Sequence, residues 1–285
     1  MGRSKVAFIL ATILVGASCS AKAAPNDLSQ VMIDVSQAND LAAVLKNARR
    51  RNIELVVARA TVGIGDPDTA FDKNLALLRA SKGMMMGAYH ALYPTHPGAE
   101  QAAEFLRRVK RSCRAGDTIL LAVDWERASL HHKTIAPAGG AILADFVRAI
   151  VTATGQPPLV YTDPDVIAAD RAAAGQVASA PLWLSTYYTK LSLFRKCQNE
   201  KKSGISICKN FIRGLLFPDD ADFAPWTDWT FWQFTEASKE DPAYLRRRVT
   251  NDLPVDVSFF GGSREDFHQF FDQHAVRCEA INVAD

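Results

Sequence analysis

The stretch LLAVDWE, residues 120–126, is an apolar run that ends in two carboxylates, Asp124 and Glu126, with Trp125 between them. Such a run is typical of a strand buried inside a protein, where even an unpaired neutral polar group costs roughly 2–7 kcal/mol. Because side chains alternate along a strand, positions 124 and 126 point the same way, about 7 Å apart, and Trp125 points the other way, toward a helix layer. The two acids therefore indicate either a functional site or a hidden ion pair.

Similar apolar, β-rich runs recur along the chain. The predicted strands are residues 31–36, 53–61, 84–92, 118–126, 157–162, 180–187, 229–235 and 253–260. Amphipathic spacing predicts helices between the first five strands. These helices cover residues 39–52, 68–83, 98–113 and 138–155. Strands that alternate with helices predict a parallel sheet with the helices outside, and eight strands favour a closed barrel. We therefore expect an α/β fold, an irregular TIM-like barrel of about eight strands with fewer than eight regular helices.

Two segments stand apart from this pattern. Basic residues precede an apolar run over residues 6–17, and small residues follow as far as Ala23. This is the layout of a secretory signal, and the run is shorter than the roughly 20 residues of a membrane span. We expect residues 1–23 to be a signal peptide and 24–285 a single catalytic barrel domain, exported to the periplasm or secreted. Cys19 leaves a lipoprotein as the alternative.

The second segment is a polar stretch, later rich in proline and aspartate, at about residues 190–225. It is too long for an ordinary connection between barrel elements. We therefore expect a loop excursion after the sixth strand.

Charge argues against a nucleic-acid partner. The chain has 33 Lys and Arg residues against 31 Asp and Glu, a net charge of +2. Three of the basic residues and none of the acids lie in residues 1–23, so the remainder carries a net charge of −1. A protein that binds nucleic acid usually has a clear basic excess. We expect no nucleic-acid partner, no stable membrane span after the signal, and a monomer.

Four cysteines remain beyond Cys19, and an even number in an exported protein indicates disulfides. Cys197 and Cys208 lie close together in the polar stretch, which favours a local bridge, and Cys113 would then pair with Cys278. Free buried thiols are the alternative for the second pair. No C-x-x-C spacing occurs, so we expect no zinc site and no other metal or cofactor.

Acids lie on three separate strands of the predicted barrel. Asp34 comes late in the first strand, Asp124 and Glu126 end the fourth, and Asp256 lies in the eighth. Barrel chemistry is located at the carboxyl ends of the strands, so we expect the four acids to meet at one rim. Crowded carboxylates raise at least one pKa, which leaves one acid protonated and another ionised. Cleavage of a glycosidic bond needs this division of labour.

Several other side chains could contact a sugar in such a site, because flat aromatic rings suit the faces of sugar rings. The candidate substrate contacts are Arg59, Tyr89, His90, Tyr161, Trp183, Tyr187, Trp232 and Gln233. Structural alternatives remain open for some of them. Arg59 could neutralise Asp124 or Glu126 in a buried network, His90 could be a hydrogen-bond partner near the barrel mouth, and Asp34 could cap the following helix.

A set of motifs in a fixed order resembles the glycoside hydrolase family 25 lysozymes, the muramidases of fungi, bacteria and phages. The motifs are IDVSQAND (33–40), VVARATVG (56–63), LLAVDWE (120–126), PPLVYT (157–162), PLWLSTY (181–187), FWQFT (231–235) and VDVSFFGGSREDF (255–267). The resemblance implies a mostly parallel β/α barrel that cleaves the β-1,4 bond after N-acetylmuramic acid in peptidoglycan without a cofactor. By position, it implies that Glu126 is the proton donor, Asp124 its acidic partner, and Asp34 and Asp256 flanking acids. It also implies groove contacts at Tyr89, Tyr161, Trp183, Tyr187 and Gln233.

The chain departs from that family pattern at three positions. Val62 stands where an acid is usual, Ala91 where an aromatic residue follows the histidine, and Ser258 where the last strand has asparagine. Since all four acids are present, we interpret the departures as changes in the shape of the groove. They leave two alternatives, a barrel that binds peptidoglycan without cutting it and a chitinase-like hydrolase.

Overall fold

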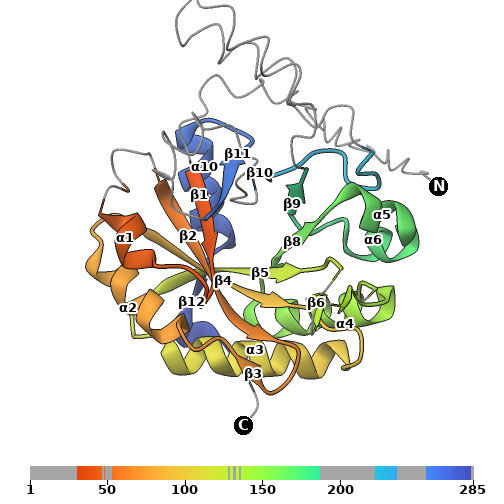
Figure 1. The fold of residues 1–285 in the computed structure, drawn as a ribbon, viewed down its shortest axis with the longest axis horizontal. Coiled ribbons are helices and arrows are strands. Elements are labelled where there is room, and N and C mark those ends of the chain that lie inside the picture. Colours follow the sequence, from red (N-terminus) through yellow and green to blue (C-terminus); the bar gives the residue numbers. More distant parts are fainter. Residues whose placement is uncertain are drawn as a thin grey trace, which may run out of the picture.

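Eight strands in the described part of the chain close into a barrel at the centre of the molecule (Figure 1). The barrel strands are β1 (Val31–Val35), β2 (Ile53–Val62), β4 (Met85–Ala91), β5 (Thr118–Asp124), β8 (Leu159–Thr162), β9 (Leu182–Ser185), β10 (Phe231–Thr235) and β11 (Asp256–Phe260). Their order around the barrel is β1-β11-β10-β9-β8-β5-β4-β2, and pairing of β1 with β2 closes it. Each strand falls within a predicted run or extends it by one residue, so the predicted α/β barrel is confirmed.

This computed structural model describes residues 31–46, 48, 53–127, 129–130, 133–134, 136–186, 222–235 and 255–283. Several expectations lie outside these residues. They are the signal peptide over residues 1–23, the lipid site at Cys19, Tyr187, the Cys197–Cys208 pair and most of the excursion at 190–225.

The direction of the last strand differs from the prediction of a parallel sheet. β11 runs antiparallel to both β10 and β1, whereas the other barrel pairs are parallel. The alternation of apolar side chains along a strand is the same in either direction, so the pattern contains no information about this reversal. Its consequence is that Asp256, the first residue of β11, lies opposite Asp34. Reversal therefore brings the last acid to the rim where the parallel strands end.

Helices cover the outside of the barrel (Figure 1). They are α1 (Leu41–Leu45), α2 (Phe71–Ala80), α3 (Gly98–Ser112), α4 (Gly140–Thr154), α5 (Pro164–Ala169), α6 (Arg171–Val177) and α10 (Arg264–His274). The remaining elements are short: β3 (Asp66–Pro67), β6 (Ser129–Leu130), β7 (Lys133–Thr134), β12 (Val276–Arg277) and the 3₁₀ turn η4 (Cys278–Ala280). The four predicted helices are present, and the first is much shorter than its predicted range. No helix of the described residues combines the length and apolarity needed to cross a membrane.

Alternate side chains along the strands build two separate cores. One fills the barrel interior, with Leu55, Val57, Leu120 and Ala122 among its members. The other lies between the strands and the helices and includes Trp125, which is fully buried. The Trp125 indole Nε1–H donates to the carbonyl oxygen of Ala138 at 2.8 Å. The predicted orientation of Trp125 toward the helices is therefore confirmed.

Aromatic rings close one end of the barrel. Phe231 begins β10 and pairs with Phe260 at the end of β11, so both lie at the end opposite the acids. Phe267 and Phe271 of α10 pack into the same interior cluster, with the Phe267 ring centroid 5.3 Å from that of Phe260. These aromatic rings form the floor of the barrel, at the end opposite the rim where the acids lie.

A disulfide fastens the C-terminal segment beneath the barrel. Cys113, directly after α3, is bonded to Cys278 in η4, at a sequence separation of 165 and with a Cα–Cα distance of 5.8 Å. The predicted Cys113–Cys278 pair is therefore confirmed. Val276 of β12 also pairs with Ile119 of β5, so covalent and backbone contacts join the same two segments.

Candidate active site

The structure brings the four acids together at the mouth of the barrel. Asp34 lies near the end of β1 opposite Asp256, Asp124 is the last residue of β5, and Glu126 follows two residues later. Asp34 is only 9% exposed. Burial raises the pKa of Asp34 well above its ordinary value, and the charges of Asp256 and Glu126 raise it further. The acids are thus close enough to govern one another's ionisation, as the sequence predicted.

Burial and neighbouring charges also shift the pKa of Asp124. Burial is the largest cause that raises its pKa well above the ordinary value, followed by the charges of Glu126 and Asp34, whereas the charge of Arg59 lowers it. Interacting carboxyls titrate as a group, so the cluster keeps protons at pH values where a free aspartate has lost its proton. A proton donor and an ionised partner can therefore coexist in this site.

Arg59 forms its ion pair with a different acid from those that the sequence suggested. Arg59 projects from β2, and its Nε–H donates to Oδ2 of Asp68 at 2.9 Å. Asp68 is fully buried and also accepts the backbone N–H of Ala70, ahead of α2. The direct ionic partner of Arg59 is therefore Asp68, and Arg59 acts on Asp124 through its charge.

A chain of hydrogen bonds supports the acids from inside the barrel. The Tyr161 hydroxyl donates to Oε1 of Gln233 at 2.8 Å, and the Gln233 Nε2–H donates to Oδ2 of Asp34 at 2.8 Å. Trp183 packs edge-on to Tyr161 and donates its Nε1–H to Oγ of Ser258 at 3.0 Å.

The position of these aromatic rings corrects one expectation. Tyr161 and Trp183 are only 6% and 2% exposed, so their ring faces are not open to a sugar. They hold Asp34 and the barrel wall from below. Tyr89 also faces the interior, where burial and the charge of Asp34 raise its pKa well above the ordinary value.

His90 and Trp232 lie on the outer face of the barrel, which corrects their assignment as substrate contacts. His90 is fully buried between Thr61 Oγ1, 2.8 Å from its Nδ1, and Gln101 Oε1, 3.0 Å from its Nε2. Burial lowers the pKa of His90 to about 4, so the ring is neutral near pH 7. Trp232 is 3% exposed and donates to Thr186 Oγ1 at 2.7 Å. Each follows or precedes a residue that faces the interior, and alternation along the strand turns it outward.

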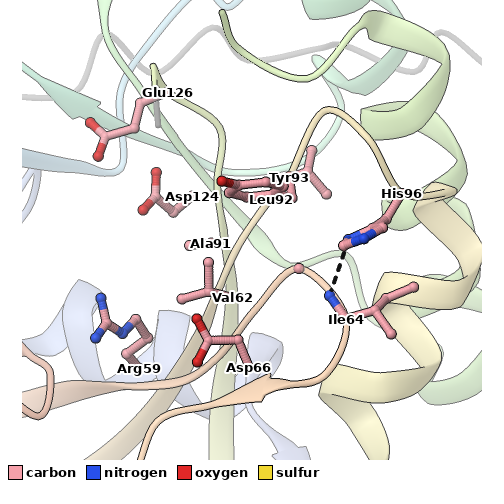
Figure 2. A pocket seen from close by; sticks show the side chains of 11 residues that line it. Arg59, Val62, Ile64, Asp66, Ala91, Leu92, Tyr93, His96, Asp124 and Glu126 are labelled. Atoms are coloured by element: carbon pink, nitrogen blue, oxygen red, sulfur yellow. Dashed lines mark hydrogen bonds between the residues drawn. The ribbon is translucent and has the colours of Figure 1, made fainter. Parts of the chain in front are cut away.

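A pocket of about 500 Å³ opens beside Asp124 and Glu126 (Figure 2). Its other walls are the hairpin between β2 and β3 and the loop between β4 and α3. The lining residues are Arg59, Val62, Gly63, Ile64, Asp66, Ala91, Leu92, Tyr93, His96, Asp124 and Glu126. Such a volume is within the range of small-ligand sites. Sequence reasoning missed Asp66, Tyr93 and His96, although the rule that barrel chemistry uses the loops after the strands could have indicated the last two.

The two loops that form the pocket are held to each other. His96 Nδ1 accepts the backbone N–H of Ile64 at 3.2 Å, the bond drawn in Figure 2. Gly63 between them has a φ of +52°, and a Cβ there would lie 2.9 Å from His96 Nδ1. Glycine is therefore required both for the backbone conformation and for the close approach of the loops.

The described residues offer one group of side chains that could approach a metal ion, formed by Cys113, Asp117 and Cys278. Its two sulfur atoms are bonded to each other, so they are not available as thiolate ligands. This group lies at the disulfide beneath the barrel and is separate from the acids.

Comparison with known proteins agrees with this geometry. The model of the glycosyl hydrolases family 25 matches residues 33–241. No curated protein sequence matches the chain. The fold is similar to the bacterial lysozyme from Streptomyces coelicolor, with 18% identity over 86% of this chain and 97% of that one and a TM-score of 0.56. It is similar to the muramidase from Acremonium alcalophilum, with 18% identity over 86% and 99% of the two chains and a TM-score of 0.59.

A family 25 glycosyl hydrolase from Bacillus anthracis has the same fold, with 17% identity over 84% of this chain and 92% of that one and a TM-score of 0.55. At these identities the likeness shows the barrel fold, whereas the family model extends over most of the sequence and includes three of the four acids. The chain therefore belongs to the glycosyl hydrolases of family 25 and is a glycoside hydrolase.

Proposed function

We propose that the protein is an exported muramidase that hydrolyses the β-1,4 bond between N-acetylmuramic acid and N-acetylglucosamine in peptidoglycan. The observation that supports this most is the meeting of four acids from three strands beside a pocket at the open end of the barrel. The similar structures described as lysozyme and muramidase support the choice of substrate. Export is supported by the signal-like residues 1–23 and by the Cys113–Cys278 disulfide, a bond typical of oxidising compartments.

In this proposal Glu126 protonates the leaving oxygen of the glycosidic bond. It lies beyond the end of β5 and lines the pocket, so its carboxyl group can reach a bound sugar. Asp124 acts from deeper in the site, either by positioning the acetamido group of the substrate for internal attack or by activating a water molecule. Oδ1 of Asp124 is buried without a hydrogen-bond partner among the described residues, which leaves it available to accept an N–H or O–H of a reactant.

The two possible roles of Asp124, positioning the acetamido group and activating water, lead to different stereochemistry of the product. Direct displacement through a covalent enzyme intermediate goes with carboxyl groups about 5 Å apart, inversion with a separation of up to about 9 Å, and help from the acetamido group does not follow this rule. NMR detection of the first-formed anomer decides between them. Retention is expected if the acetamido group attacks, and inversion if Asp124 activates water.

Replacement of the proton donor tests the proposal. We expect Glu126→Gln to lower reducing-end release from purified sacculi by about 100-fold or more, because general acid catalysis contributes at least that factor. Glu104→Gln is the matched control, since Glu104 lies on α3 and pairs with Arg107 away from the pocket. Near-normal lytic activity of Glu126→Gln would show that the assignment is wrong.

A peptidoglycan-binding barrel without hydrolytic activity is the second candidate, and Val62 is the observation that favours it. Val62 lines the pocket where family members usually have an acid. Ser258, another of the three departures, is fully buried and accepts the Trp183 indole N–H, so it shapes the barrel interior beneath the acids. Binding to sacculi without release of reducing ends would support this candidate. Activity on chitin oligomers but not on peptidoglycan would instead support a chitinase-like enzyme.

A further inference from the structure

The hairpin of β2 and β3 presents an exposed carboxylate to the pocket. Asp66 is the first residue of β3, it is exposed, and it lines the same pocket as Asp124 and Glu126. Figure 2 shows the Asp66 carboxylate beside Val62, with Glu126 on the other side of the pocket. Val62 and the two residues that follow it have no polar side-chain atom. Asp66 is therefore the polar side chain of this hairpin wall.

A bulge in β2 turns this part of the hairpin toward the pocket. The pairing of β2 with β4 shifts between Arg59 and Thr61, so Ala60 is an extra residue on β2. Ala60 packs in the outer core, and Thr61 also faces outward, with its Oγ1 2.8 Å from Nδ1 of His90. The bulge thereby displaces the alternation of the strand by one residue. As a result, Arg59 and Val62 both line the pocket although they are three positions apart.

Pairing across the hairpin fixes the place of Asp66. Asp66 lies directly opposite Val62 on the antiparallel pair of β2 and β3. Side chains at such positions point to the same face, and their Cβ atoms are about 4.5–5.5 Å apart. The turn between the two residues is held by the hydrogen bond from the Ile64 backbone N–H to His96. The hairpin therefore presents the Asp66 carboxylate at a defined position in the pocket.

The protein itself makes no use of the Asp66 carboxylate. Among the described residues its side chain has no hydrogen bond and no ion pair, whereas Arg59, the cation of the same pocket, is paired with Asp68 at 2.9 Å. An ionised carboxylate accepts hydrogen bonds and cannot donate them. The ligand group that suits Asp66 is therefore a hydrogen-bond donor, and hydroxyl groups are abundant donors on a glycan.

We propose that Asp66 is a substrate-binding residue that positions a sugar of the glycan strand. Its carboxylate accepts hydrogen bonds from sugar hydroxyl groups, on the side of the pocket away from Glu126. This inference rests on the proposed function and adds a second wall to the substrate site, formed by the hairpin of β2 and β3. Asp66 transfers no proton in this proposal, so it contributes to binding and leaves the chemical step to the acids at the barrel mouth.

Weaker binding with retained turnover is the expected effect of removing the carboxylate. We expect Asp66→Ala to raise KM for soluble glycan fragments without peptides about 10- to 100-fold, the size of a hydrogen bond to a charged group. Because the contact is the same before and during bond cleavage, kcat is expected to change less than about threefold. In protein that carries Glu126→Gln, addition of Asp66→Ala is expected to weaken fragment binding by the same factor as KM. Asp66→Asn keeps one acceptor oxygen and is a second arm, expected to lose less.

An exchange of the two opposite residues separates a binding role from a structural one. Val62→Asp combined with Asp66→Val moves the carboxylate across the hairpin and keeps it in the pocket. We expect the exchange to return the affinity to within about fivefold of the parent, because the new carboxylate starts only about 5 Å from the old one. Asp272→Ala is the matched control, since Asp272 is an exposed acid on α10 that does not line the pocket. It is expected to change neither KM nor kcat.

The outcomes separate this inference from the proposed function. The contact is wrong if Asp66→Ala leaves KM and affinity within about twofold of the parent, less than the loss of one hydrogen bond. It is also wrong if kcat falls as much as KM rises, or if the exchange recovers nothing. Reducing-end release by the unmodified protein is measured alongside. Release together with unchanged affinity of Asp66→Ala overturns the contact alone, whereas a recoverable loss of affinity without any release overturns the hydrolase and leaves the contact in place.

Discussion

The two ends of the barrel contrast in how they use burial. At the mouth, Asp34 and Asp124 are buried close to other acids, and a carboxylate oxygen of Asp124 has no partner among the described residues. At the floor, Phe267 and Phe271 pack against other aromatic rings, and Cys278 is bonded to Cys113. In barrels of this kind, residues at the carboxyl ends of the strands serve chemistry and those at the opposite end serve stability. We infer that the free energy gained by packing aromatic rings at the floor offsets the free-energy cost of burying several acids close together at the mouth.

The largest effect on stability is expected at the floor. Phe267→Ala removes a ring that is 1% exposed, and such truncations destabilise proteins by about 3–5 kcal/mol. We expect denaturant unfolding to show a loss of this size, while kcat of the folded fraction at low temperature changes less than about twofold. Glu126→Gln is the counterpart at the mouth, with activity lost and the unfolding midpoint retained. If Phe267→Ala lowered kcat and left the free energy of unfolding unchanged, the contrast between the two ends would be wrong.

A somewhat smaller loss is expected when the disulfide is removed. Replacement of Cys113 and Cys278 together by serine releases a constraint that spans 165 residues, and native disulfides typically contribute about 2–4 kcal/mol. Thermal unfolding of the double variant with and without reductant measures the effect. We expect reductant to lower the Tm of the parent protein more than that of the variant, in which only the predicted Cys197–Cys208 bridge would remain to be reduced. Equal sensitivity of the two proteins would contradict this assignment.

The smallest effect is expected at the mouth, with the opposite sign. The pKa of Asp34 is raised in the folded protein by burial, by Asp256 and by Glu126. Its contribution to stability is therefore fully present below the unfolded pKa of about 3.9 and is lost as the pH rises through the raised folded value. We expect Asp34→Asn, which keeps an acceptor for Gln233, to flatten this decline and to be more stable than the parent at neutral pH. Urea unfolding at pH 5 and pH 8 measures the difference, and an Asn variant with the same pH dependence would contradict it.

Much of the fold was accessible from the sequence because its signals are local. Alternation within strands and periodicity within helices identified all eight barrel strands and the four helices between the first five. The pairing of Cys113 with Cys278 was predicted by elimination, after Cys197 and Cys208 had been assigned to each other, with free thiols as the alternative, and the structure confirms it. The direction of β11 could not be predicted, because a strand pattern is the same when reversed.

The site was only partly accessible. The acids could be placed because each lies at or near a strand end, and the structure brings them together. His90 and Trp232 were placed in the groove by residue type, although alternation relative to Tyr89 and Gln233 turns them outward. Tyr93 lies in a loop, where no periodicity indicates which side chains face the ligand.

The reversed direction of β11 determines what a proteolytic cut after this strand would separate from the acids. Because β11 starts at the rim and ends at Phe260, the chain emerges at the far side, where α10 supplies Phe267 and Phe271. A protease that cut after Phe260 would spare every acid of the site, and the segment that carries Phe267 and Phe271 would stay covalently attached through the Cys113–Cys278 disulfide. A reductant that also opened this disulfide would free the segment and remove its aromatic rings from the base of the barrel.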